Sequence, residues 1–409
     1  MRFRVAPPSR RSGEGRETIA GKIEQWLKGA GRLWLRQVAP KATPMSSPLP
    51  AAELEKISRI LVVRLDDRLG NIVLLTALLV ALKGRFSRAQ LTCLLSQRYS
   101  DLKQFIPSVD EFLIFDRSAL AHNPVRVRPL LKHIQQQNYD LVINAADDRS
   151  LSFNHLMVTA LSGGRIRVGH DHSAARRYYE VSVPIPSEKA KDAPIRHVTD
   201  MHLDLLRALA PIRSTTRPLI RRPRNDTGFG AAFAFRTQPS GKPLVLIHPG
   251  GRGPKRWKPK HFAEVARSLH ATGDYRVGLV WGPADIEAAD VILEAAKDAV
   301  HPVGVLAFDD LVSLICSATV FVASDCGPMH LASALDTATV AIFLVSDAGK
   351  YHPRGDNDVT LDGRHERITP ERVVEAIGTA AAGARETAAK RAALMAGGSS
   401  DVPSNTEPE

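Results

Sequence analysis

The feature that most constrains the fold is a repeated pattern in which a short apolar run is followed by a turn and then by a helical stretch. In the first half this pattern starts at 60–65 and 72–83, and apolar runs return at 90–95, 111–115 and 141–144. In the second half it starts at Pro243 and returns at 276–283, 318–335 and 338–343. Apolar strands that alternate with helices are typical of parallel βαβ units. The sequence therefore predicts an α/β protein in which two Rossmann-like domains with parallel sheets face each other across a cleft.

The length of 409 residues suits two domains of roughly 150 to 200 residues each, with some chain left over. A stretch rich in Arg, Pro and Thr at 211–225 indicates the boundary between them. We expect a basic N-terminal extension with an amphipathic helix and a linker over 1–56, and a first Rossmann-like domain over 57–220. The second Rossmann-like domain is expected over 221–380, and a disordered tail over 381–409.

Composition places the chain among globular proteins, since 44% of its residues are hydrophobic and 24% are charged. Its longest apolar stretches are too short to cross a bilayer, and the N-terminus lacks the apolar core of a secretion signal. Three cysteines without CxxC spacing fit a reducing compartment. From these features we expect a cytoplasmic protein.

The net charge of +12 is concentrated at the N-terminus, where residues 1–50 hold ten Lys or Arg against three Glu. Within that region, apolar residues recur at helical spacing over 19–38, and two of them are Trp26 and Trp34. Such a basic amphipathic helix is typical of docking at an anionic membrane surface, although packing against the protein's own body is an alternative. The local placement of the charge argues against a nucleic-acid groove.

Three turns after predicted strands carry residues suited to ligand binding. In "HPGGRGPKRW" (248–257), Gly250 and Gly251 let the backbone approach a ligand while Lys255 adds positive charge, which suits a diphosphate; the alternative is a solvated loop. In "SDCGPMH" (324–330), Asp325 could accept ribose hydroxyls and His330 faces the same crevice, or the motif could only cap a helix.

The third turn, "VWGPADIE" (280–287), offers Trp281 to a nucleobase and Asp285 or Glu287 to a hydroxyl. The chain contains no GxGxxG, P-loop or GxSxG motif, and no HExxH or clustered Cys/His set. A nicotinamide or flavin dehydrogenase is therefore disfavoured, and we expect neither a resident cofactor nor a metal.

Taken together, "ILVVRLDDRLGNIVLLTALLVAL", "VLIHPGGRGPKRWKPKHFAEVARSL" and "VASDCGPMHLASAL" resemble glycosyltransferase family nine, the bacterial lipopolysaccharide heptosyltransferases. The resemblance covers roughly 57–377. It implies a GT-B fold whose C-terminal domain binds an ADP-sugar such as ADP-heptose and whose N-terminal domain binds a lipid-linked oligosaccharide acceptor. It also implies transfer with inversion and without a metal, by a protein that is peripheral on the inner membrane.

Carried over by position, the resemblance assigns the diphosphate-contacting lysine to Lys255 and the donor-binding set to Asp325, Gly327 and His330. Two positions that are often Thr or Ser in the family are Gly250 and Gly251 here. Backbone N–H groups would then have to do what hydroxyls do elsewhere. On the acceptor side, Arg64, Arg68 and Arg149 are candidates for binding acidic groups of a core oligosaccharide, with solvated surface charges as the alternative.

The largest departure from the family lies in the first loop, where a Gly-Asp pair supplies the proposed general base and this chain has Gly70 followed by Asn71. Asn cannot accept the proton, and general-base assistance is worth about 10²- to 10⁴-fold in rate. Asp66 or Asp67 could substitute, or either could merely cap the following helix. A catalytically degenerate nucleotide-sugar-binding protein is thus an alternative to a heptosyltransferase. A nucleotide-sugar epimerase is a third, disfavoured by the motifs.

Overall fold

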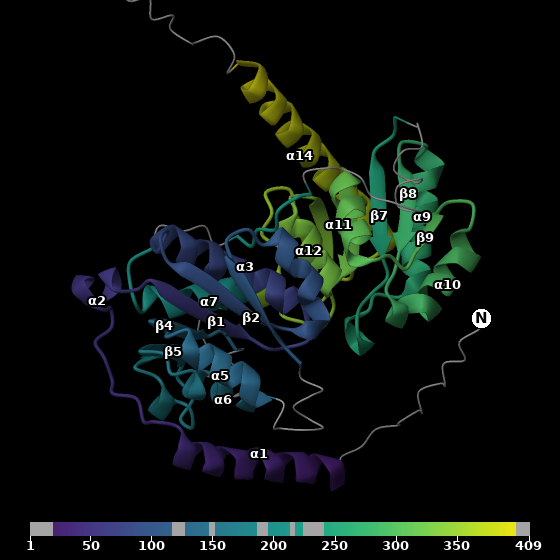
Figure 1. Ribbon diagram of the computed structural model, residues 1–409. Helices are drawn as coiled ribbons and strands as arrows, with labels where there is room; N and C mark the ends of the chain where they lie inside the picture. The colour runs from purple at the N-terminus through teal and green to yellow at the C-terminus, as the bar shows by residue number, and fades with distance from the viewer. Residues whose placement is uncertain are drawn as a thin grey trace, which may run out of the picture.

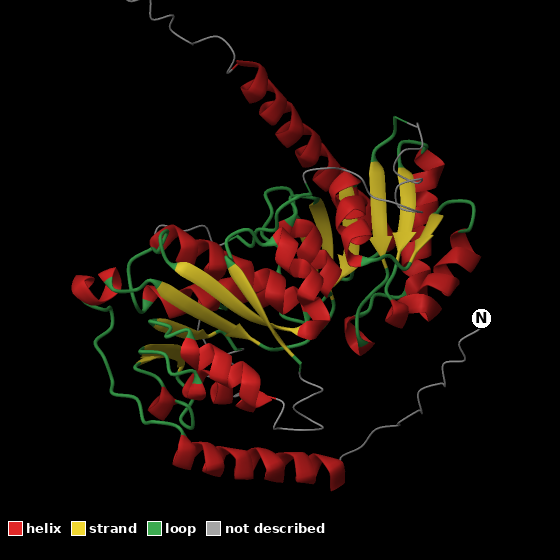
Figure 2. Cartoon of the chain, viewed as in Figure 1, coloured by secondary structure: helices red, strands yellow, loops and turns green. Residues whose placement is uncertain are grey.

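The computed structural model describes residues 19–116, 127–146, 152–185, 195–212, 217–223 and 241–397. Within these ranges the chain forms two α/β domains, each built on one six-stranded sheet (Figure 1). Helices cover both faces of the sheets, so the strands are buried as the apolar runs predict (Figure 2). Arg149 lies outside the described residues.

The first sheet has the strand order β3-β2-β1-β4-β5-β6, and every described pairing in it is parallel. Its strands are β1 (Arg59–Arg64), β2 (Gln90–Ser96), β3 (Glu111–Phe115), β4 (Leu141–Asn144), β5 (Ile166–His170) and β6 (Val181–Val183). The helices around it are α2 (Ala51–Glu55), α3 (Leu69–Arg85), η1 (Gln97–Phe105), α5 (Arg128–Gln136), α6 (Phe153–Leu161), η3 (Arg176–Tyr178) and α7 (Val198–Arg207).

The second sheet has the order β12-β11-β10-β7-β8-β9 and is also parallel throughout its described pairings. Its strands are β7 (Leu244–His248), β8 (Arg276–Val280), β9 (His301–Gly304), β10 (Val320–Ser324), β11 (Ala338–Phe343) and β12 (Val359–Asp362). Its helices are η4 (Gly253–Lys255), α9 (Pro259–Thr272), η5 (Pro283–Asp285), α10 (Ile286–Ala296), α11 (Phe308–Ser317), α12 (Gly327–Ala334), α13 (Ala348–Tyr351) and α14 (Pro370–Gly397). Counted from its own first strand, this order repeats that of the first sheet, so the prediction of two Rossmann-like domains is confirmed.

Helix α3 connects the two domains because it is apolar on nearly all sides. It packs against α7 within the first domain and against α12 of the second. The N-terminal ends of α3 and α12 meet at two glycines. A Cβ on Gly70 would lie 2.7 Å from Cδ2 of His330, and one on Gly327 would lie 2.8 Å from Cβ of Leu69. The absence of side chains at these two positions therefore sets how closely the domains approach.

A second contact between the domains involves α7 and the segment after α13. The Nε2 of His197 donates to the carbonyl of His352 over 2.9 Å, and Arg354 pairs with Asp200 at 2.6 Å. Burial lowers the pKa of His197 to about 3, so its ring is neutral, and while Nε2 donates to this carbonyl, Nδ1 accepts from Thr199 N over 3.1 Å. The two domains are thus joined by polar contacts as well as by helix packing.

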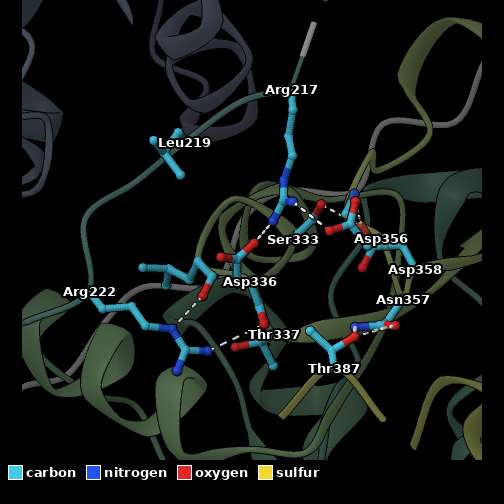
Figure 3. Close-up of polar contacts among 12 residues, drawn as sticks. Arg217, Leu219, Arg222, Ser333, Asp336, Thr337, Asp356, Asn357, Asp358 and Thr387 are labelled. Atoms are coloured by element: carbon cyan, nitrogen blue, oxygen red, sulfur yellow. Dashed lines mark hydrogen bonds and ion pairs between the residues drawn. The ribbon is translucent and has the colours of Figure 1, made fainter. Parts of the chain in front are cut away.

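The described part of the chain between the domains, 217–223, is fixed to both of them. Leu219 N donates to Oγ1 of Thr76 on α3, and Ile220 N donates to the carbonyl of Ala334 at the end of α12. Figure 3 shows the arginines of this segment: Arg217 pairs with Asp336 and with Asp356, and Arg222 donates to the carbonyl of Leu335. Hydrogen bonds and ion pairs to both domains therefore fix the position of this segment at the domain junction.

Helix α14 continues to Gly397, so residues 381–397 are helical, which corrects the expectation that the disordered tail begins at 381. Ala380 and Ala381 are buried against the second domain, and farther along Thr387 bonds to Asn357 at 3.1 Å and Arg391 pairs with Asp336 at 3.4 Å. Beyond these contacts the helix projects away from the body (Figure 1). An alanine-rich sequence explains this extension, since alanine favours helix even without a packed face.

Helix α1 (Ile19–Val38) has the predicted bounds and lies along the outside of the first domain, below α5 and α6 in Figure 1. Leu35 is fully buried there, and Gly31 allows close contact with the ring of Phe153 on α6. Leu33 and Trp34 point outward with 64% and 47% of their surface exposed. The alternative of packing against the protein's own body is therefore confirmed for one side of the helix, while another side stays exposed. None of the helices within the described ranges is long and apolar enough to cross a bilayer.

Candidate active site at the domain junction

Two of the three predicted ligand-binding turns, and the loop after β1, lie where the strand order of a sheet reverses. In the second sheet this point falls between β7 and β10, which end at His248 and Ser324 and lead into the first and second of these turns. In the first sheet it falls between β1 and β4, and β1 leads into the loop that ends at Gly70. Ligands of open parallel sheets bind at such points, beyond the carboxyl ends of the strands.

The carboxylate of Asp325 brings together the donor residues that the sequence predicted. Nζ of Lys255 lies 2.6 Å from its Oδ2, and Nε2 of His330 lies 3.9 Å from its Oδ1. A third partner, Oγ of Ser346, donates to Oδ2 over 2.5 Å from the loop after β11. Lys255 and His330, 75 positions apart in the sequence, therefore converge at the N-terminal end of α12.

The electrostatics of this cluster keep Asp325 charged and His330 neutral. Burial raises the pKa of Asp325, but hydrogen bonds from Lys255 and Ser346 outweigh it and hold the pKa below its usual range. Burial lowers the pKa of His330 to about 4, against the opposing attraction of Asp325. Its Nδ1 is buried and has no hydrogen-bond partner among the described residues. The site therefore holds one anion and one cation in contact, beside a neutral imidazole.

The glycine turn after β7 is shaped by His248 beneath it. Gly250 N donates to Nδ1 of His248 over 3.0 Å, and a Cβ on Gly250 would lie 2.3 Å from Cε1 of that ring. Gly251 has a φ of +139°, a conformation that favours glycine. The expectation that the Gly250 amide is available to a diphosphate is therefore corrected, because this N–H already donates its hydrogen bond to His248. Burial lowers the pKa of His248 to about 4, which keeps Nδ1 an acceptor.

The third predicted turn joins the same site through Asp285. Arg256 Nη2 donates to Oδ1 of Asp285 over 2.6 Å, and the Nε of the same arginine donates to the carbonyl of Gly251. Asp285 Oδ2 would lie 3.4 Å from a Cβ on Gly250. Arg256 thus ties the glycine turn to the Asp285 turn, and it fixes the loop that carries Lys255.

On the side of the first domain, Asp66 is the centre of the loop that follows β1. Its Oδ2 pairs with the guanidinium of Arg64, and its Oδ1 accepts from Arg68 N at 3.2 Å and from Nδ2 of Asn71 at 3.1 Å. The bond from Arg68 N closes the turn just before α3, so Asp66 does shape the entry to that helix. Asn71 supplies a donor that an aspartate at this position would lack.

The neighbouring Asp67 is held from the opposite side of the loop. Its Oδ1 accepts from Oγ of Ser96 at the end of β2, and its carbonyl accepts from the hydroxyl of Tyr99 over 3.2 Å. Both candidate bases therefore already accept hydrogen bonds, and each would have to exchange a partner in order to take a proton from a substrate.

The predicted acceptor arginines differ in their surroundings. Arg64 is 1% exposed, and its Nη1 contacts the carbonyl of Ala145 and, at 3.1 Å, Nε2 of His202. The alternative of a solvated surface charge is therefore wrong for Arg64, which lies behind the loop and holds Asp66. Arg68 is exposed.

Sequence reasoning missed two residues of this site. Ser346 follows β11, and its bond to Asp325 depends on β10 and β11 being neighbours in the sheet, which no local pattern reveals. His248 is the last residue of β7 and follows four apolar residues. Its position directly before "PGG" was the only local signal of its role. The described residues contain no group of three or more His, Cys, Asp or Glu side chains that could hold a metal ion.

The family follows from a match to the model described as glycosyltransferase family 9 (heptosyltransferase), which spans residues 127–379 and so more than half of the chain. This chain belongs to glycosyltransferase family 9, and its class of activity is glycosyl transfer.

Known proteins similar to this chain are heptosyltransferases. Lipopolysaccharide heptosyltransferase 3 of Escherichia coli is 24% identical over 321 residues, which cover 74% of this chain and 88% of that protein. The structure of E. coli ADP-heptose lps heptosyltransferase II matches 79% of this chain and 98% of its own, with a TM-score of 0.62 and 22% identity. The family 9 glycosyl transferase from Veillonella parvula DSM 2008 matches 79% and 97%, with a TM-score of 0.67 and 19% identity. At these identities the two structures establish the GT-B fold.

Proposed function

We propose that this protein transfers a heptose, or a closely related sugar, from ADP-heptose to an acceptor of the lipopolysaccharide-core type, with inversion and without a metal. The observation that carries the proposal is the convergence of Lys255, His330 and Ser346 on Asp325 at the start of α12, against Gly70 of the acceptor-domain loop. Support for the donor comes from the similar E. coli protein whose name includes ADP-heptose.

In this proposal the diphosphate of the donor lies at the N-terminal end of α12. Lys255 exchanges Asp325 for a phosphate oxygen, and the amides of the first turn of α12 supply further positive potential. Negative charge grows on the departing ADP as the sugar–phosphate bond breaks. Donors already in place therefore stabilise the transition state more than the bound substrate. Asp325, once released by Lys255, accepts hydrogen bonds from hydroxyl groups of the ribose or the sugar.

The acceptor hydroxyl approaches from the loop that follows β1, where Asp66 or Asp67 takes its proton. Asn71 orients Asp66 rather than acting itself, since an amide nitrogen that donates to the carboxylate cannot also accept a proton. Arg68, which is exposed on the same loop, is placed to meet an acidic group of the acceptor, and Arg149 is proposed beside it on sequence grounds.

A second candidate function is nucleotide-sugar binding without turnover. The observation that favours it is the engagement of both loop carboxylates, Asp66 by three partners and Asp67 by Ser96, with an asparagine where the family has its base. In this alternative the donor site is intact and the protein binds ADP-heptose but forms no product.

The experiment that separates the two candidates is a transfer assay with ADP-heptose and a truncated core acceptor, followed by mass spectrometry. A heptosylated product that requires both substrates supports the proposed enzyme. Binding of ADP without product supports the degenerate protein, and neither binding nor product contradicts both. A screen of other nucleotide sugars in the same assay identifies the donor if ADP-heptose is inactive.

We also propose that residues 19–38 dock on the anionic surface of the inner membrane, where lipid-linked acceptors are found. The exposed Leu33 and Trp34 on α1 support this location. A Leu33→Gln/Trp34→Gln protein keeps Leu35 and its packing, and it is expected to lose most binding to anionic vesicles. Undiminished vesicle binding by this variant would contradict docking through α1.

A further inference from the structure

A cavity lies between α1 and the body of the first domain, away from the donor site in the second domain. It has a volume of about 520 Å³. Gly29, Arg32, Leu33 and Arg36 of α1 line one side, and residues around η3 together with Lys41 line the other. We call it the α1 cavity. Arg32 and Arg36 are four residues apart, so they lie on one face of the helix.

The α1 cavity is strongly basic. Arg32, Arg36, Lys41 and Arg177 all line it, and none of these four has a carboxylate partner among the described residues. The nearby acids face other cations, since Asp171 pairs with Arg176 and Glu180 with Arg167. Four uncompensated cations around one cavity attract an anion, and guanidinium groups match phosphate geometry well.

Two buried atoms of this cavity lack partners. Nε of Arg32 and Nε of Arg177 are both shielded from solvent, and neither donates to an acceptor among the described residues. A buried donor without an acceptor is costly, so native structures rarely leave one unsatisfied. Phosphate oxygens between α1 and η3 would satisfy both. The face of Tyr178, 5.3 Å from the guanidinium carbon of Arg177, holds that side chain in place.

The segment that closes the cavity is fixed rather than a loose tether. Ala42 N donates to the carbonyl of Arg177 and Met45 N to that of Glu180, so the chain after α1 is bonded to the edge of the first domain. These two bonds therefore hold the backbone around Lys41 and Arg177 in place opposite α1. Residues 40–50 resemble a linker by composition, and Lys41 of this segment forms part of the cavity wall.

We propose that the α1 cavity binds the phosphate headgroup of an acidic membrane phospholipid. A membrane lipid is favoured over a soluble phosphate because Leu33 lines the cavity yet is 64% exposed, and Trp34 stands beside it with 47% exposed. An outward-facing leucine and tryptophan next to a basic cavity suit the boundary between headgroups and acyl chains. The inference rests on the membrane docking proposed above, but not on the chemistry of the donor site.

The test compares binding of the full chain to vesicles of phosphatidylglycerol with phosphatidylcholine and to vesicles of phosphatidylcholine alone. Wild type is expected to bind only the anionic vesicles. An Arg32→Gln/Arg177→Gln protein should bind about tenfold or more weakly, since each basic residue near an anionic surface contributes substantially. The matched control Arg267→Gln/Lys297→Gln removes the same charge from the exposed surface of the second domain and should bind as wild type. Equal binding to both vesicle types would overturn the proposal.

A second variant separates the cavity from general attraction by charge. A Cβ on Gly29 meets nothing within 4 Å, so Gly29→Leu fits without a clash, keeps all four cations and occupies the cavity. If the headgroup enters the cavity, Gly29→Leu weakens anionic-vesicle binding several-fold. If α1 binds only as an amphipathic helix, the added leucine leaves binding unchanged or tightens it, and the cavity proposal is wrong.

Two further measurements assign the ligand and isolate this inference from the others. Glycerol phosphate in solution should compete only weakly with vesicles. Competition as strong as that of the vesicles would show that the ligand is a soluble phosphate rather than a lipid. Binding of ADP, measured on the same proteins by calorimetry, should be the same in all of them. Loss of ADP binding in all of these proteins, wild type included, would overturn the proposed function. The lipid-binding proposal would still be decided by the vesicle measurements.

Discussion

The two loops that meet at the domain junction have opposite electrostatic designs. In the second domain, Asp325 contacts one mobile cation, Lys255, whose side chain is 42% exposed and can turn to an incoming phosphate. In the first domain, Asp66 is tied to the buried Arg64, to a backbone N–H and to the Asn71 amide. The donor side can therefore exchange partners with little rearrangement. The acceptor side, by contrast, holds its carboxylates in fixed positions.

The largest expected effect comes from removing the base on the acceptor side. Asp66→Asn and Asp67→Asn, assayed separately, should reveal one variant whose kcat falls by about 10²- to 10⁴-fold. Asp66→Asn should also lower the melting temperature, because it leaves the buried Arg64 without its anion. Full turnover in both variants would show that this loop supplies no base.

An Asn71→Asp protein tests the role of residue 71 in the acceptor-side loop. It restores the residue of the family but removes the Nδ2 donor to Asp66, so two carboxylates would face each other. We expect a bell-shaped pH profile whose acidic limb moves to higher pH, because neighbouring carboxylates raise each other's pKa and the base must be deprotonated to act. A pH profile identical to wild type would mean that residue 71 does not communicate with the base.

The next largest effect concerns the glycine contact that joins the two sides. Gly327→Ala places a Cβ 2.8 Å from that of Leu69 and 3.3 Å from Gly70 N, so the acceptor loop has to move. A displacement of this kind is expected to lower kcat/KM by roughly 10²-fold. Gly84→Ala on α3 is the control, because its Cβ would meet nothing within 4 Å. Equal rates for both variants would argue against catalysis at this junction.

A smaller effect is expected from the buried histidines of the donor side. In the folded protein the pKa of His330 and of His248 is about 4, against 6.5 for an ordinary histidine. Between these two values the unfolded chain binds more protons, so stability falls as the pH decreases from about 6.5 towards 4. By about pH 5, each histidine lowers the free energy of unfolding by roughly 2 kcal/mol relative to neutral pH.

The measurement is thermal unfolding followed from neutral to acidic pH. His330→Gln should flatten the decline, whereas His270→Gln, which changes an exposed position on α9, should leave it as in wild type. An unchanged slope in His330→Gln would contradict the assignment of a buried neutral ring.

The sequence predicted the parts of this structure that local patterns control. Alternating apolar runs and turns predicted both sheets, because a parallel strand must be buried and must be followed by a crossover. The convergence of Lys255, Asp325 and His330 also followed, because the turns after neighbouring parallel strands share one edge of the sheet.

What the sequence could not predict depends on contacts between distant segments. The use of the Gly250 amide by His248 and the bond from Ser346 to Asp325 arise only when strands are placed side by side. The burial of Arg64 was missed for the same reason, since an arginine at a strand end is more often exposed. The extent of α14 to Gly397 was missed because an alanine-rich stretch that passes gradually into polar residues does not mark where a helix ends.

The most direct test of the account is the affinity for ADP measured by calorimetry in three proteins. Lys255→Ala should bind ADP at least about tenfold more weakly than wild type, a loss of about 1.4 kcal/mol, because the phosphates lose their mobile cation. Lys260→Ala, which removes an exposed lysine from the adjacent helix, should bind as tightly as wild type. Undiminished affinity in Lys255→Ala would contradict the placement of the donor diphosphate beside Asp325 and α12.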